Sequence, residues 1–88
     1  MLDAATALKD FAGYAAANRI EFGPHARKRM DERGATYRDV RFALMNARSC
    51  FVQPNGRWRV ESADEDGTAL NLICGIEDGV FVVTLMGD

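Results

Sequence analysis

The chain has 88 residues, of which 48% are hydrophobic and 27% are charged, and its formal net charge is −2. This composition excludes a fibrous or intrinsically disordered protein, and the length allows one domain over residues 1–88 with a modest core but not two. Asp3 stands where a secretory signal would carry basic residues, and no apolar run approaches the roughly 20 residues of a membrane span, so we expect a cytoplasmic protein that does not enter a membrane.

The first predicted element is an amphipathic helix from about Asp3 to Ala17. Its apolar positions recur with the helical period and are Ala5, Leu8, Phe11, Ala12 and Ala15. We expect this face to pack on a core. A short extended stretch from Arg19 to Phe22 follows and leads through Gly23 into the next helix.

The second predicted helix is the segment P-H-A-R-K-R-M-D-E-R-G, residues 24–34. Proline is favoured in the first turn of a helix and glycine just past its end, which sets both limits. Ala26 and Met30 form a narrow apolar stripe that we expect to anchor the helix. The side chains of the neighbouring ridge are all polar: His25, Lys28, Arg29, Glu32 and Arg33. We expect this ridge to face a partner.

A third helix is predicted from a capping box. Thr36 and Asp39 have the required spacing, with Asp in place of the usual Glu, and the helix then runs to about Ala47. The predicted inward face consists of Tyr37, Val40, Ala43, Leu44 and Ala47. The arginines of this segment, Arg38, Arg41 and Arg48, are predicted to point away from that face.

From Ser49 onward the apolar period changes from 3.6 to 2. Strands are predicted near residues 49–53, 57–62, 68–76 and 80–86, separated by the turns P-N-G, D-E-D-G and E-D-G. Four sequential strands with short turns form an antiparallel meander, and one face must pack on the helices. The predicted fold class is therefore α+β: helix, short strand, two helices, then a four-stranded antiparallel meander packed on the helices.

Alternation along the strand at 57–62 separates two kinds of side chain. Trp58 and Val60 share the apolar face, and the opposite face carries Arg57, Arg59 and Glu61. The two arginines are spaced to clamp a phosphate; the alternative is that they form ion pairs with the acids of residues 64–66 or with other neighbouring acids. If Trp58 were exposed instead, it would stack on a base.

Charge is divided unevenly along the chain. Residues 19–59 hold ten Lys or Arg and four Asp or Glu, a balance of 10 − 4 = +6, whereas residues 60–88 hold seven acids and no Lys or Arg, a balance of −7. A cationic surface on a weakly acidic protein is typical of nucleic-acid binding, although the same charges can simply be solvated.

The two cysteines, Cys50 and Cys74, have neither metal-ligand nor disulfide-rich spacing, so we expect buried thiols in a reducing compartment. The sequence also contains no Gly-rich phosphate loop and no Cys/His cluster. We therefore expect neither a metal nor an organic cofactor.

The pattern His25-Ala26-x-x-Arg29-Met30-x-x-Arg33-Gly34, followed by Tyr37-x-Asp39-Val40, resembles the signature of a widespread prokaryotic family of uncharacterised small domains. The resemblance spans roughly residues 20–86. That family is in turn similar to the RelE, BrnT and MqsR ribonuclease toxins of toxin-antitoxin pairs. The resemblance implies a RelE/BrnT-like fold, metal-independent RNA cleavage, and a partner resembling an antitoxin that covers the cationic groove.

Such cleavage uses the RNA 2′-hydroxyl as nucleophile, so it needs proton carriers and fixed positive charge at the phosphate. On the family comparison His25 would be the acid or base, with Glu61 as a second proton carrier. Arg29 and Arg33 would clamp the phosphate from the helix and Arg57 and Arg59 from the sheet. Lys28 and Arg41 would add RNA contacts.

Several alternatives remain open at the level of sequence. A histidine just inside a helix start often caps the helix or makes a local hydrogen bond. Arg33 lies close to the apolar stripe and can instead tie its helix to the sheet or to Asp39. The whole domain can be a noncatalytic nucleic-acid-binding module, or a protein-interaction module whose basic helices meet an acidic partner or a second copy of the chain.

Overall fold

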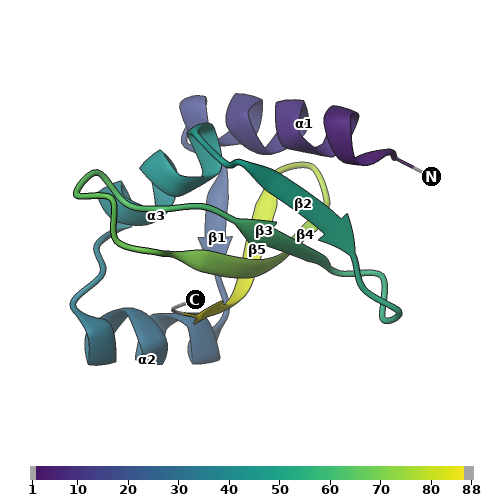
Figure 1. Ribbon diagram of the computed structural model, residues 1–88. Helices are drawn as coiled ribbons and strands as arrows, with labels where there is room; N and C mark the ends of the chain where they lie inside the picture. Colours follow the sequence, from purple (N-terminus) through teal and green to yellow (C-terminus); the bar gives the residue numbers. More distant parts are fainter. Residues whose placement is uncertain (1, 87–88) are drawn as a thin grey trace.

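Three helices and one five-stranded mixed sheet make up residues 2–86, the part of the chain that the computed structural model describes (Figure 1). In chain order the elements are α1 (Ala4–Ala16), β1 (Ile20–Phe22), α2 (Pro24–Arg33), α3 (Tyr37–Met45), β2 (Ser49–Val52), β3 (Trp58–Glu61), β4 (Asn71–Ile76) and β5 (Val80–Met86). The predicted order of helices and strands and the α+β class are confirmed. No helix in these residues is long and apolar enough to cross a membrane.

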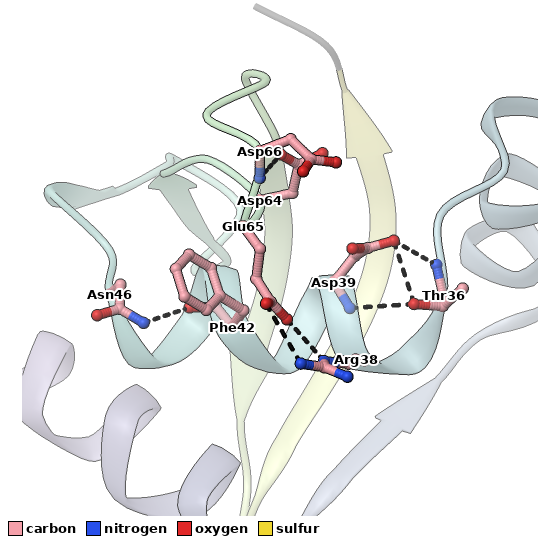
Figure 2. A network of polar contacts seen from close by, with 8 residues as sticks. All are labelled: Thr36, Arg38, Asp39, Phe42, Asn46, Asp64, Glu65 and Asp66. Atoms are coloured by element: carbon pink, nitrogen blue, oxygen red, sulfur yellow. Dashed lines mark hydrogen bonds and ion pairs between the residues drawn. The ribbon is translucent and has the colours of Figure 1, made fainter.

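Local sequence signals set the ends of the helices. The Asp3 carboxylate caps α1 by accepting the Thr6 N–H at 2.8 Å, and this hydrogen bond lowers the pKa of Asp3. Gly34 ends α2 in the left-handed conformation, with φ of 66°, which costs a glycine little. The capping box of α3 is confirmed, since Thr36 and Asp39 exchange hydrogen bonds in both directions (Figure 2).

The sheet differs from the predicted one. Its strand order is β1-β5-β4-β3-β2, with antiparallel pairing from β2 through β5 but parallel pairing between β1 and β5, where Ile20 lies opposite Val80. The predicted four-stranded antiparallel sheet is thus not matched exactly. Parallel strands that are distant in the chain are not joined by a short turn, so no local sequence signal indicates their pairing. The short stretch at residues 20–22 therefore could not be assigned to this edge of the sheet from the sequence.

The core lies on one face of the sheet, and all three helices contribute to it. Trp58 is 7% exposed and meets Phe11 of α1 edge-on, with ring centroids 6.4 Å apart. The predicted apolar face of β3 is confirmed, so Trp58 is not free to stack on a base. The buried core residues of the helices are Ala7, Phe11, Ala15, Ala26, Val40, Ala43 and Leu44, with Met30 packed against them.

Two residues of the predicted inward faces are exposed. The predicted inward position of Ala5 is wrong. The buried residues of α1 are Ala7, Phe11 and Ala15, and Ala5 is turned about 200° from Ala7 around the helix. Tyr37 is 38% exposed. Its ring does not enter the core but packs edge-on against Phe22 at the surface.

The two cysteines are buried, as predicted, and neither forms a disulfide. Burial raises the pKa of both thiols, and for Cys74 the pKa reaches about 12.

Candidate nucleic-acid interface

The second face of the sheet carries the side chains that alternate with the core. Strand register places Phe51, Arg59, Ile73 and Thr84 in one row across β2, β3, β4 and β5. Ile73 is only 8% exposed, yet it is not part of the core cluster that the helices cover. We call this side the open face; its residues are Ser49, Phe51, Arg57, Arg59, Glu61, Asn71, Ile73, Gly75, Phe81, Thr84 and Met86.

A cleft of about 440 Å³ lies at the end of the open face where β3 finishes and β4 begins. Its lining consists of Arg48, Ser49, Arg59, Glu61, Ser62, Ala69 and Asn71. The Glu61 carboxylate accepts the Ser49 hydroxyl at 3.1 Å and lies 3.7 Å from the Arg59 guanidinium. A carboxylate is therefore held between a hydroxyl and an arginine in a partly open pocket, which suits both phosphate binding and proton transfer.

Arginines from α2 reach the same end of the sheet. Arg33 donates to the carbonyl oxygen of Ala69 at 2.9 Å, on the rim of the cleft, and Arg29 donates to the carbonyl oxygen of Leu85 at 3.2 Å. Arg59 approaches the sulfur of Met86, the residue after Leu85, at 3.8 Å. Guanidinium groups from helix and sheet thus gather around the start of β4 and the end of β5.

Both α2 arginines also have a structural role, as the alternative reading of Arg33 allowed. Arg33 joins α2 to the segment before β4 and does not pair with Asp39, whose carboxylate is used in the capping box. Arg29 is shared between the Leu85 carbonyl and Glu32, which lies 3.8 Å away.

His25 lies on the exposed surface of the first turn of α2. The helix is capped at Gly23 without a side-chain hydrogen bond, so His25 is not the capping group, and it forms no hydrogen bond or ion pair within residues 2–86. This turn borders the open face, because the ring of Phe81 lies 3.1 Å from the position that a Cβ on Gly23 would take. Lys28 is also exposed on α2.

Arg57 lies just before β3 and is exposed on the open face side of the hairpin. Arg59 is paired with the neighbouring Glu61 at 3.7 Å, so the alternative of ion pairing with a nearby acid is confirmed for Arg59. Within residues 2–86 the acids of the loop at 64–66 pair with neither Arg57 nor Arg59. Glu65 instead binds Arg38 of α3 at 2.7 and 3.3 Å and raises its pKa (Figure 2). Asp64 accepts the backbone N–H of Asp66 at 2.9 Å.

Arg41 is placed away from the other candidate residues. Its guanidinium donates to the carbonyl oxygens of Ala15 and Ala16, at 2.9 and 3.3 Å, at the C-terminal end of α1. Because α1 packs on the core face of the sheet, Arg41 and the open face lie on opposite sides. Arg41 stabilises α1 by satisfying its last carbonyl groups.

Five cleft residues were not predicted from the sequence: Arg48, Ser49, Ser62, Ala69 and Asn71. Arg48 was predicted only to point away from the inward face of the third helix. Its backbone N–H pairs with the Glu61 carbonyl oxygen at 3.0 Å and brings it beside β3. Ser49 lies two residues before the exposed Phe51, so strand alternation could have placed both side chains on the same face. Asn71 gives no such signal, because only the register reveals that it lies next to Glu61.

Fold and site together define a small α+β protein with a cleft, lined by two arginines and Glu61, at one end of its sheet. Comparison with protein-family models, with curated proteins and with solved structures finds no match. Within residues 2–86, no three His, Cys, Asp or Glu side chains gather as a metal site would require.

Proposed function

We propose that this protein binds RNA on the open face of its sheet and acts there as a metal-independent endoribonuclease of the toxin type that its signature resembles. One observation carries the proposal: Arg59 lies 3.7 Å from Glu61 in the cleft, and Arg33 of α2 donates to the carbonyl oxygen of Ala69, another residue of the cleft lining. RNA presents one phosphate per nucleotide, and arginine forks match phosphate geometry.

The backbone hydrogen bonds of Arg29 and Arg33 support phosphate binding. A guanidinium has five N–H donors, and each of these arginines uses one of them on a carbonyl oxygen. The remaining donors are held in position before RNA arrives, which lowers the entropy cost of the contact. Arg48 and Arg59 in the cleft add two more cations.

Cleavage requires a group that removes the 2′-hydroxyl proton. The 2′-oxygen then attacks phosphorus, the bond to the 5′-oxygen breaks, and that oxygen takes up a proton, leaving a 2′,3′-cyclic phosphate. Glu61 is the cleft residue suited to the first step, and His25 is suited to proton transfer near neutral pH. A partner resembling an antitoxin would block the reaction by covering the open face.

A noncatalytic RNA-binding module is the second candidate, and one observation favours it. His25 lies at the end of α2 that borders Phe81, whereas Arg33 at the other end reaches the cleft of Glu61. His25 and Arg33 are eight positions apart along the helix, a rise of about 12 Å. The two proton carriers are therefore poorly placed to act on one phosphate at the same time.

Binding of a fluorescent single-stranded oligoribonucleotide at several salt concentrations tests the shared part of both candidates. The slope of log K against log salt should be about −0.7 for each phosphate neutralised, and Arg48→Gln and Arg59→Gln should each make it shallower by about that amount. Arg38→Gln is the matched control, because Arg38 lies on α3, outside the cleft, where it is paired with Glu65. Absence of salt-dependent binding, or an equal effect of Arg38→Gln, would contradict the proposal.

Cleavage in the presence of EDTA separates the two candidates. The nuclease should produce ends with a 2′,3′-cyclic phosphate, and Glu61→Gln and His25→Ala should each slow the reaction about 100-fold or more, as loss of a general acid or base does. RNA that is bound with normal affinity but left intact by the wild-type protein would identify the noncatalytic module.

A further inference from the structure

Two aromatic rings are exposed on the open face. Phe51 is 48% exposed and Phe81 is 39% exposed, whereas Phe11 and Trp58 are buried in the core. Register places Phe51 opposite Arg59 and Phe81 opposite Gly75. Exposed aromatic side chains beside arginines suggest a surface for planar ligands that also carry negative charge.

An empty space adjoins Phe81. Gly75 has no side chain, and a Cβ built there would meet no atom within 4 Å. Arg57 lies on the other side of Gly75, because Trp58 is paired with Cys74 and the neighbouring residues follow the same register. The sheet thus offers a flat gap between the ring of Phe81 and the chain of Arg57.

The two rings are separated by a distance that suits an extended strand. Phe51 is on β2 and Phe81 on β5, three strand spacings apart and one row displaced, which is on the order of 16 Å. Arg57 and Arg59 belong to β3 and its approach, between the rings. Acidic side chains also border the face: Glu21 lies opposite Phe81, and Glu61 lies in the cleft.

We infer that the open face binds single-stranded RNA, stacking unpaired bases on Phe51 and Phe81 while Arg57 and Arg59 hold the phosphates between them. The inference rests on the proposed function and specifies its substrate. A duplex keeps its bases paired and inaccessible to the rings, whereas an unpaired strand offers both base faces and phosphates.

The test compares three probes of about twelve nucleotides: a single strand, an abasic strand with the same number of phosphates, and a duplex. Fluorescence anisotropy should show the single strand binding more tightly than the other two. Phe51→Leu should weaken single-strand binding about 5-fold to 100-fold, the range for loss of one stacked base, and should leave abasic-strand binding unchanged. Phe51→Trp should restore binding, since it keeps a ring.

Met45→Ala is the matched control, because Met45 is 39% exposed on α3 rather than on the open face. Phe81→Leu is a supporting variant only, since the Phe81 ring packs over Gly23 at the start of α2. Equal affinity for the normal and abasic strands, with no effect of Phe51→Leu, would overturn base stacking and leave phosphate binding standing. Tighter binding of the duplex would overturn it as well. Failure of all three probes to bind would remove the proposed function too.

Discussion

Replacing Arg33 by glutamine should lower the stability of the fold. The Arg33 guanidinium donates to the carbonyl oxygen of Ala69 at 2.9 Å and joins two segments that are 36 residues apart in the chain. A hydrogen bond from a charged donor at a partly buried site contributes about 1.5 kcal/mol to the free energy of unfolding. For a domain of this size each kcal/mol corresponds to about 4–8 °C in Tm, so we expect a decrease of about 6–12 °C.

Thermal unfolding followed by circular dichroism measures this effect directly. Arg57→Gln is the matched control, because Arg57 is exposed and its side chain has no partner within residues 2–86, so its change in unfolding free energy should stay below about 0.5 kcal/mol. Arg33→Lys should fall between the two, since an ammonium keeps the charge but not the planar fork. A Tm for Arg33→Gln within about 2 °C of the wild type, together with weaker RNA binding, would refute a role for Arg33 in the fold.

Three further predictions concern the fold and its titration. Met30→Asp should unfold the domain, because Met30 packs against the core and a carboxylate there would lose its hydration. His25→Ala should unfold at the wild-type temperature, because His25 is exposed. Equal destabilisation of both variants would show that the histidine is structural. Gly34→Ala should lower the free energy of unfolding by about 1–2 kcal/mol, because Gly34 has a φ of 66°. Gly13→Ala in α1 should raise it by about 0.5–1 kcal/mol, and urea unfolding measures both changes. An unchanged free energy of unfolding in Gly34→Ala would contradict the left-handed cap. Burial raises the pKa of Cys74 from 9.0 to about 12, so between these pH values the folded state binds up to one proton more than the unfolded state. The free energy of unfolding should therefore fall by up to about 1.4 kcal/mol per pH unit from pH 9 upward. The fall should be smaller in Cys74→Ala.

Signals that act within a few residues predicted the local structure well. Asp3, the Thr36 and Asp39 pair, and Gly34 each cap a helix through contacts no more than four residues away, so their effect is visible in the sequence. Alternation likewise placed Trp58 on the core face of β3.

Contacts between distant segments were beyond that kind of reasoning. The parallel pairing of β1 with β5 and the cleft between Arg48 and Asn71 both depend on strand order and register. Residue type alone also could not distinguish the arginines: Arg41 binds the end of α1 and Arg38 binds Glu65, while Arg59 faces the cleft. Long arginine side chains reach several neighbours, so only the surrounding fold decides which one each of them contacts.

The pairing of Ile20 with Val80 has a consequence for how the chain folds during synthesis. These partners are sixty positions apart, so at 5–20 residues per second β1 emerges from the ribosome about 3–12 s before the strand that it must pair with. Until then β1 has no sheet edge to join, and its apolar side chains remain accessible to chaperones and proteases. Sheet assembly should therefore finish only when the last strand has left the exit tunnel, which makes completion of the fold a late, high-contact-order event.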